Sequence, residues 1–419
     1  MENKVLVFIP FIDKDDMNYR LLEMSGLLDS LLWDREFIGF KINVIRHGTY
    51  FNEDRINEIQ SMIKELHEKD INITSLVLDV NLSGTQVSKL EEIFNIPVID
   101  KTNLILRIFK SRATSKEAKL QVEIATLQYQ AAQLVHTDAD YSQVTSGSGK
   151  NKGSGEKEKE LEKRRIKNRI HQKRKELQEI KIARKTGRNL RKSTQIPTIA
   201  IVGYTNAGKS TLINLLLKHS KSKQAKEVYA EDRLFATLET STRLIDFYNY
   251  PSFLLTDTVG FLKDLPHFLI SAFRSTLEEI KEADLLIEVV DISSPFYKEN
   301  IETTDDILKQ LGADNVNKIV FLNKHDLCFD GADYLPKKNE IFTSFVDDEY
   351  SYLEIIDFIM NNLTIKWNTY DFLIPFEEVV KFRKCSYVLK EEIKENGILY
   401  TARINPINFD YYSKYLFND

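Results

Sequence analysis

Cysteine, glycine and proline are scarce in this sequence, and each shortage argues against a class of protein. The two cysteines among 419 residues, Cys328 and Cys385, are far apart and form no CxxC pair, so neither a disulfide framework nor a cysteine-based zinc site is supported. The 15 glycines and 9 prolines exclude a collagen-like or largely disordered composition. We therefore expect globular domains in a reducing, cytoplasmic setting.

Long apolar runs are also absent. No stretch of about 18 apolar residues occurs, and the N-terminal residues MENKVLVFIPFIDKDD carry no cationic region ahead of an apolar one. These two features predict neither a membrane span nor a secretory leader. With roughly 150 residues per domain as a guide, the length predicts about two to four domains.

Positive charge is concentrated in one segment of an otherwise acidic chain, whose formal net charge is -5. Between Gly149 and Lys192 there are 18 Lys and Arg against 6 Asp and Glu, whereas the rest of the chain has 40 against 57. The segment is either the solvated face of a coiled coil or a nucleic-acid-binding surface, whose cations displace counterions from phosphates. Lys150, Lys152 and Lys157 favour nucleic acid, because a flexible basic loop could enter a crevice in folded RNA.

Strand and helix patterns alternate through the first hundred residues. Apolar runs at Val5–Pro10, Phe40–Arg46, Ser75–Val80 and Pro97–Asp100 are separated by helical patterns. This alternation is typical of a small α/β domain with a mainly parallel sheet.

Two long helical patterns follow, over residues 114–192. The first begins at Thr114-x-x-Glu117, which resembles a capping box, and the second contains the basic segment. The turn-rich residues 145–156 lie between them. This arrangement predicts an antiparallel hairpin of two helices.

A glycine-rich phosphate loop is predicted at residues 203–210. The apolar run Thr198–Val202 leads into GYTNAGKS, and TLINLLL follows, so GxxxxGKS lies between a strand and a helix, as this motif requires. Backbone N–H groups would cradle the phosphates, Lys209 would neutralise β- and γ-phosphate charge, and Ser210 would ligate Mg²⁺. The loop residues expected at the nucleotide are Gly203, Tyr204, Thr205, Asn206, Ala207, Gly208, Lys209, Ser210 and Thr211.

Two further motifs decide which nucleotide binds. DTVG follows the apolar run FLLT, so its carboxylate can hold Mg²⁺ through water and its glycine N–H can contact the γ-phosphate. NKHD follows KIVFL, and its final carboxylate can accept from the ring N–H and exocyclic amine of guanine. Since open α/β sheets bind ligands at the carboxyl ends of strands, the motifs predict a GTP-hydrolysing enzyme. Their residues are Asp257, Thr258, Val259, Gly260, Asn323, Lys324, His325 and Asp326.

The switch segment is less sharply marked. Thr237, within LFATLET, is the expected threonine that completes the Mg²⁺ shell and senses the γ-phosphate, although Thr240, Ser241 and Thr242 are nearby candidates. Its neighbours Phe235 and Ala236 are also expected at the nucleotide. The predicted catalytic residues are then Lys209, Thr237 and Gly260, and the predicted Mg²⁺ ligands are Ser210, Thr237 and Asp257.

Three details bear on catalysis and affinity. Phe261 stands where signalling GTPases have the glutamine that orients the attacking water, so intrinsic hydrolysis should be slow and should need a partner. Asn206 either coordinates a potassium ion beside the phosphates or satisfies a local turn. Thr343, Ser344 and Phe345 best match the loop that contacts the guanine base, without its usual Ser-Ala pair.

The chain resembles the HflX family of ribosome-associated GTPases over most of its length. GYTNAGKST, LFATL, DTVGF with its hydrophobic residue after the glycine, and NKHD resemble that family's motifs. Val98–Tyr129 is similar to the family's stretch that joins the N-terminal domain to the helical hairpin. Gly153–Ile170 resembles the family's GPGE loop and basic helix, with Ser154 in place of proline and Lys159 in place of leucine.

The resemblance implies an α/β protein of four parts. These are an N-terminal α/β ribosome-binding domain at residues 1–113, a helical hairpin with a basic glycine/lysine-rich loop at 114–192, a P-loop GTPase domain at 193–364 and a small C-terminal α/β domain at 365–419. It also implies binding of GTP, GDP and Mg²⁺, association with the large (50S) ribosomal subunit, and GTP-dependent splitting of stalled ribosomes. We expect the ribosome to stimulate GTP hydrolysis. We expect a cytoplasmic, ribosome-associated monomer.

Alternative functions stay open because the hairpin loop diverges from the family pattern. A large-subunit assembly GTPase and an antibiotic-resistance paralogue are the alternatives among enzymes. A nucleotide-gated RNA-binding module, whose turnover is incidental, is the alternative of a different class.

Overall fold

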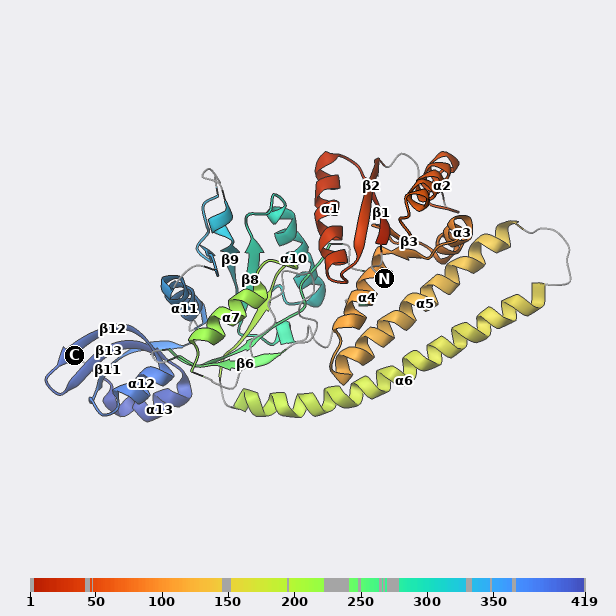
Figure 1. Ribbon diagram of the computed structural model, residues 1–419. Coiled ribbons are helices and arrows are strands. Elements are labelled where there is room, and N and C mark those ends of the chain that lie inside the picture. The colour runs from red at the N-terminus through yellow and green to blue at the C-terminus, as the bar shows by residue number, and fades with distance from the viewer. Residues whose placement is uncertain are drawn as a thin grey trace. The chain divides into compact units, whose positions relative to one another are not determined.

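The chain forms two compact units in the computed structural model (Figure 1). The first is made mainly of residues 1–185 and the second mainly of residues 186–419. The structure describes residues 4–41, 46, 48–144, 152–193, 196–221, 241–247, 250–263, 266, 268–269, 279–328, 334–346, 349–363 and 367–417. No helix in these ranges is long and apolar enough to cross a membrane.

The first unit is built on a parallel four-stranded sheet in the order β2-β1-β3-β4. Its strands are β1 (Lys4–Phe11), β2 (Asp34–Lys41), β3 (Ile73–Leu78) and β4 (Val98–Asp100). The helices that follow each strand are α1 (Lys14–Asp29), α2 (Glu53–Glu68), α3 (Gly84–Phe94) and α4 (Lys101–Arg112). Residues 5–9 of β1 are at most 1% exposed, which explains the unbroken apolar run of this central parallel strand.

Polar side chains begin these helices where the sequence supplies them. Ser83 and Gln86 form a complete capping box at α3, and the Asp100 carboxylate accepts a first-turn N–H of α4 at 2.7 Å. At the start of α5, Ser115 accepts the Ala118 N–H at 3.1 Å, one residue after the threonine from which a capping box was predicted. Each cap satisfies an amide that has no partner within its helix.

Two long helices that run in opposite directions form the hairpin (Figure 1). They are α5 (Lys116–Val144) and α6 (Lys152–Ser193). Gln133 of α5 donates to the Leu82 carbonyl at 3.0 Å, and a Cβ on Gly84 would lie 2.0 Å from the Gln133 carbonyl oxygen. Because only glycine permits this approach, α5 lies directly against α3. Glu123 of α5 in turn pairs with Lys173 of α6 at 3.1 Å.

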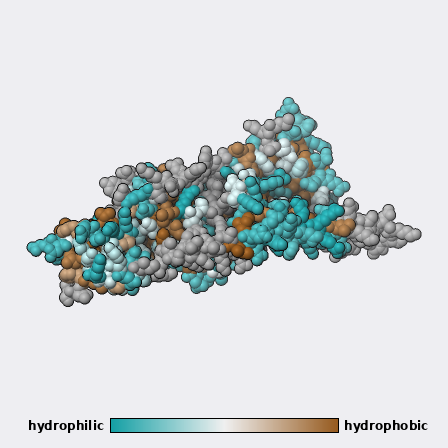
Figure 2. All heavy atoms as spheres, turned by 90° about the horizontal axis from the view of Figure 1, so that it is seen from below, coloured by the Kyte–Doolittle hydropathy of each residue, from teal (hydrophilic) through white to brown (hydrophobic). Residues whose placement is uncertain are grey.

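α6 buries a narrow apolar stripe and exposes most of its basic side chains. Ile166 and Leu177 are 4% and 7% exposed, whereas Arg164, Lys167 and Arg174 are exposed. The side of α6 seen in Figure 2 is accordingly hydrophilic. The stripe explains the helical periodicity of the sequence, and the exposed cations explain its positive charge.

The second unit contains a six-stranded sheet in the order β10-β9-β8-β5-β7-β6, in which β6 pairs antiparallel with β7 and the other pairings are parallel. Its strands are β5 (Thr198–Val202), β6 (Thr242–Ile245), β7 (Phe253–Thr256), β8 (Leu285–Asp291), β9 (Lys318–Asn323) and β10 (Glu340–Phe342). Its helices are α7 (Lys209–His219), α10 (Tyr297–Leu311), α11 (Glu349–Leu363) and the 3₁₀ turn η1 (His325–Leu327). The central strands β5, β8 and β9 are almost wholly buried.

A small antiparallel sheet, in the order β11-β13-β12, ends the second unit. Its elements are β11 (Asn368–Ile374), α12 (Val379–Cys385), β12 (Ser386–Lys394), β13 (Gly397–Ile404), α13 (Pro406–Tyr412) and the 3₁₀ turn η3 (Ser413–Tyr415). Phe372, Phe382 and Tyr400 are fully buried in its core. Tyr387 of β12 packs instead into the core of the six-stranded sheet and donates to Asp357 of α11 at 3.4 Å. The predicted α/β fold class is confirmed.

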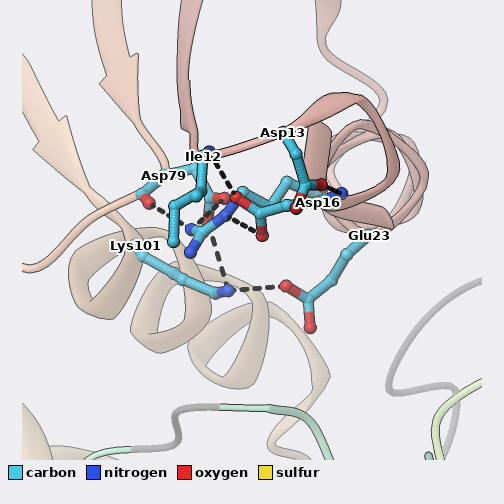
Figure 3. Close-up of polar contacts among 7 residues, drawn as sticks. Ile12, Asp13, Asp16, Glu23, Asp79 and Lys101 are labelled. Atoms are coloured by element: carbon cyan, nitrogen blue, oxygen red, sulfur yellow. Dashed lines mark hydrogen bonds and ion pairs between the residues drawn. The ribbon is translucent and has the colours of Figure 1, made fainter. Parts of the chain in front are cut away.

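A network of charged side chains lies at the carboxyl edge of the four-stranded sheet (Figure 3). Lys101 Nζ lies 2.5 Å from Glu23 Oε2 and 3.1 Å from Asp79 Oδ1. Arg20 lies 3.1 Å from the other oxygen of Asp79 and 2.9 Å from Asp16. These contacts join α1, the end of β3 and the start of α4.

Burial makes these charges depend on one another. Glu23, Asp79 and Lys101 are 6%, 1% and 5% exposed. Burial alone would lower the pKa of Lys101, but the carboxylates of Glu23 and Asp79 outweigh it and raise the pKa above its ordinary value. Lys101 therefore stays charged, and removing it would leave two buried carboxylates without their shared cation.

Replacing Lys101 by Met should destabilise the first unit by about 3–5 kcal/mol, the usual effect of removing one partner from a buried ion pair. Urea unfolding followed by Trp33 fluorescence measures this once the second tryptophan has been removed as Trp367→Phe. The control is Lys64→Met on the exposed surface of α2, with an expected change below about 0.5 kcal/mol. Equal stability of the two variants would contradict a stabilising role for the network.

Candidate nucleotide site

The loop between β5 and α7 has the backbone that phosphate binding requires. Gly203 and Gly208 have φ angles of 136° and 103°, which favour glycine. A Cβ on Gly203 would lie 2.3 Å from the Val289 carbonyl oxygen, and one on Gly208 would lie 2.3 Å from Asn323 Nδ2. α7 begins directly after Gly208 without a side-chain cap. A glycine-rich loop that opens a helix in this way directs N–H groups at an anion.

Backbone hydrogen bonds hold residues 257–260 against this loop. The Phe261 N–H donates to the Gly203 carbonyl at 3.1 Å, and the Phe261 carbonyl accepts the Thr205 N–H at 3.0 Å. A Cβ on Gly260 would lie 3.0 Å from Lys209 Nζ, so the Gly260 backbone lies beside the lysine head group. Asp257 follows β7 directly and is 2% exposed. The first and second predicted motifs therefore meet at one place.

The amino group of Lys209 is buried, so its protonation depends on the groups around it. Lys209 is 8% exposed, and its Nζ donates to the Gly203 carbonyl at 3.1 Å. Burial lowers the pKa of Lys209 to about 8, while the Asp257 carboxylate acts in the opposite direction. Phosphate oxygens beside Nζ would add negative charge and raise this pKa again.

Thr258 and Val259 belong to the core rather than to a ligand surface. The Thr258 hydroxyl donates to the Ile201 carbonyl within β5, and Val259 is 6% exposed. Their side chains hold the second motif in place, so a nucleotide would meet their backbone groups.

Asn323, at the end of β9, connects the third motif to the phosphate loop. It is 4% exposed, and its Nδ2 donates to the Ala207 carbonyl at 2.9 Å. Its Oδ1 accepts the Phe345 N–H at 3.2 Å. One amide side chain thus fixes the phosphate loop, the NKHD motif and the segment at residues 343–345 relative to one another.

The segment predicted to contact the base lies beside the NKHD motif. His325 N–H donates to the Thr343 carbonyl at 3.3 Å, and Asp326, Thr343 and Ser344 line a common pocket. Phe345 differs from its neighbours, because it is 4% exposed and its ring packs against a core phenylalanine of β9 at 6.0 Å between centroids. A base contact from Phe345 would therefore come from its backbone.

Ser210 and Asp257 form an oxygen donor set that suits Mg²⁺. The hydroxyl lies in the first turn of α7 and the carboxylate follows β7, and both are hard ligands. Among the residues that the structure describes, no group of three His, Cys, Asp or Glu side chains could hold a metal by itself.

Some predicted residues lie outside the part of the chain that the structure describes. Residues 222–240 are among these, and they include Phe235, Ala236, Thr237 and the alternative Thr240. Lys150 of the hairpin loop is another, and the side chains of Lys152 and Lys157 are likewise not described. Asn206, by contrast, is described and exposed, with a left-handed φ of 62°.

One charged residue of the site was missed by the sequence analysis. Asp291, the last residue of β8, lies 2.7 Å from Lys324 Nζ through its Oδ2. An acidic residue at the carboxyl end of an apolar strand was a signal that could have marked it, because ligands bind at such ends.

Three family models match consecutive parts of the chain. "GTP-binding GTPase N-terminal" matches residues 19–110, "GTP-binding GTPase Middle Region" matches 112–191, and "50S ribosome-binding GTPase" matches 198–324. Together they cover most of the first unit, including the hairpin, and the nucleotide motifs as far as Lys324.

Two relatives that match this chain over most of their length are both named GTPase HflX. GTPase HflX from Lacrimispora saccharolytica is 35% identical over 418 residues, covering 96% of this chain and 93% of the relative. GTPase HflX from Caldanaerobacter subterraneus is 36% identical over 365 residues, covering 86% and 81%. Among solved structures, a GTP-binding protein from Sulfolobus solfataricus in complex with GDP is 25% identical, with coverage of 87% and 99% and a TM-score of 0.45.

Nucleotide affinity should fall as pH rises through about 8, because the pKa of Lys209 in the nucleotide-free protein is lowered to about 8. Below that pH the lysine is already charged, and above it the lysine must take up a proton when GDP binds, which costs up to about tenfold in affinity per pH unit. Titrations with a fluorescent GDP analogue between pH 7 and 8.8 measure this. A constant dissociation constant over that range would contradict the lowered pKa of Lys209 in the nucleotide-free protein.

Proposed function

This chain belongs to the HflX family of GTPases, and we propose that it uses GTP hydrolysis to split stalled ribosomes into subunits. It is an enzyme that binds GTP and GDP and hydrolyses GTP. The match of residues 198–324 to the family described as "50S ribosome-binding GTPase" supports the large ribosomal subunit as its partner. In this proposal residues 1–113 and 114–192 dock on the subunit, 193–364 form the GTPase domain and 365–419 the C-terminal domain.

The exposed cations of α6 are the observation that best supports ribosomal RNA as the partner. Arg164, Lys167 and Arg174 are exposed on a helix that buries Ile166 and Leu177 on another side. A coiled-coil face balanced by ion pairs would need acidic neighbours, but the segment from 149 to 192 has 18 basic residues against 6 acidic ones. The excess charge suits a phosphate backbone.

The residues of the nucleotide site have distinct roles in the proposed reaction. Lys209 neutralises charge on the β- and γ-phosphates, and the Gly260 N–H contacts the γ-phosphate. Asp326 accepts hydrogen bonds from the guanine edge. Ser210 and Asp257, with Thr237, would hold Mg²⁺, which neutralises phosphate charge when bound.

Phe261 explains why hydrolysis should wait for the partner. It is 2% exposed, and its backbone pairs with the phosphate loop. A buried phenyl ring cannot orient an attacking water, so this position lacks the function that glutamine has in signalling GTPases. In the proposed cycle, contact with the ribosome orders the switch segment around Thr237 and supplies what Phe261 lacks.

GTP turnover with added ribosomes tests the proposal. We expect whole ribosomes and large subunits to raise the turnover rate at least about tenfold, which corresponds to a barrier lowered by about 1.4 kcal/mol. Light scattering in the same reactions should show subunit separation. Lys209→Ala is the inactive control.

The same experiment separates the alternatives. Stimulation by immature large subunits, without separation of whole ribosomes, would contradict splitting and favour an assembly GTPase. Complete separation over repeated cycles with a non-hydrolysable GTP analogue would contradict the need for hydrolysis. Turnover in matched potassium and sodium buffers tests whether Asn206 coordinates a cation. The test is needed because the left-handed backbone of Asn206 would by itself account for an asparagine in the loop.

A charge-removal variant tests the RNA contact. Replacing Arg164, Lys167 and Arg174 together by Gln should weaken binding to large subunits and reduce the slope of log affinity against log salt by about 2 or 3, close to one per lost phosphate contact. The charge-matched control replaces Lys338, Lys384 and Lys390, which are exposed in the second unit. An unchanged salt slope in the first variant would mean that α6 does not contact RNA.

A further inference from the structure

The carboxyl ends of β8 and β9 lie side by side beneath the phosphate loop. Asp291 and Asn323 are direct register partners at the ends of these strands. Gly203 lies against the backbone of β8, and Gly208 lies against the Asn323 side chain. A side chain that connects the ends of β8 and β9 therefore lies next to the residues that pack against the phosphate loop.

Lys324 makes this connection. Its Nζ lies 2.7 Å from Asp291 Oδ2. The other carboxylate oxygen of Asp291 accepts the Ser293 N–H at 3.1 Å and the Ser293 hydroxyl. Because the Ser293 turn fixes Oδ1, the orientation of Oδ2 is fixed as well. Asp291 thus presents a pre-oriented carboxylate to the lysine.

The Lys324 side chain leaves an unusual backbone conformation and would be mobile without an anchor. Its φ is 62°, a left-handed conformation that a residue with a Cβ seldom adopts. The conformation sets the direction in which the side chain leaves the backbone, between Asn323, which contacts the phosphate loop, and Asp326, which lines the base pocket. A lysine has four further rotatable bonds, so without an anchor its stem would sample many rotamers.

We infer that Asp291 is a positioning residue for guanine nucleotide binding, which holds the Lys324 stem extended across the crevice as a wall against the base and ribose. This inference rests on the proposed placement of guanine at the NKHD motif. With the stem fixed before binding, the nucleotide does not have to order it, and affinity improves. The residue acts on binding through the lysine and does not touch the reacting phosphate.

A purely structural role for the Asp291 side chain is less consistent with the contacts. The Ile292 N–H donates to the Asn323 carbonyl at 3.0 Å, and six register pairs join β8 to β9. These backbone bonds hold the strand ends together without the carboxylate. Asp291 and Lys324 side chains are 21% and 26% exposed, so the pair is neither a deeply buried structural bridge nor a freely solvated one.

The test is Asp291→Asn, which removes the charge and keeps the shape. We expect the dissociation constants of GDP and GTP to rise about tenfold, with kcat at saturating GTP unchanged within about twofold; a tenfold change in binding equals about 1.4 kcal/mol. Asp291→Glu should recover part of the affinity. The decisive comparison is a double-mutant cycle with Lys324→Met, in which Asp291→Asn should have no further effect on affinity.

Two controls separate the possible failures. Asp305→Asn removes the carboxylate of another lysine pair of the same unit, with Lys318, and should leave nucleotide affinity unchanged. Asp326→Asn should shift preference from GTP toward xanthosine triphosphate if guanine lies where we propose. An unchanged affinity in Asp291→Asn, or an equal loss in the Lys324→Met background, would overturn the positioning role. Retained GTP selectivity in Asp326→Asn would instead overturn the placement of the base.

Discussion

Close backbone packing around the phosphate loop is the constraint on which the nucleotide site depends. Gly203 lies against β8 and Gly208 against Asn323 at distances that leave no room for a Cβ atom, so β8 and β9 fix the loop together with β5. Asn323 then extends this frame to Phe345 through its second amide atom. The residues predicted to meet the phosphates and the base are thereby held by one set of strand ends, as pre-organised binding requires.

The carboxyl edges of the two parallel sheets are used in different ways. At the edge of the four-stranded sheet, Lys101 and Arg20 pair with Asp79 and other carboxylates of the same unit. At the edge of the six-stranded sheet, Lys209 is buried with its pKa lowered to about 8, a state that an added phosphate would relieve. At the first edge the charges are paired within the unit and fix the start of α4. At the second edge, a bound phosphate would stabilise the buried ammonium group of Lys209.

The sequence predicted what is encoded in contiguous residues and missed what depends on tertiary pairing. The phosphate loop, DTVG and NKHD were recognisable because each motif places its chemistry on a few neighbouring residues. The ring of Phe345 could not be assigned to the core from its motif, because only the packing on β9 shows its burial. The pairing of Asp291 with Lys324 follows from the adjacency of β8 and β9, a strand order that periodicity does not reveal. The same holds for Lys101, whose partners lie on α1 and after β3.

Phe261 gives a physical reason for separating nucleotide binding from nucleotide hydrolysis. The strand ends that hold the three nucleotide motifs lie in the second unit, and residue 261 contributes a buried ring and a backbone pairing there instead of a polar side chain. An enzyme that hydrolysed GTP rapidly by itself would lose the γ-phosphate before it met its partner. Slow intrinsic hydrolysis keeps the GTP state for as long as docking takes, and a partner that completes the site then sets the time of release. In the proposed cycle, the cations of α6 govern docking and Phe261 governs the delay.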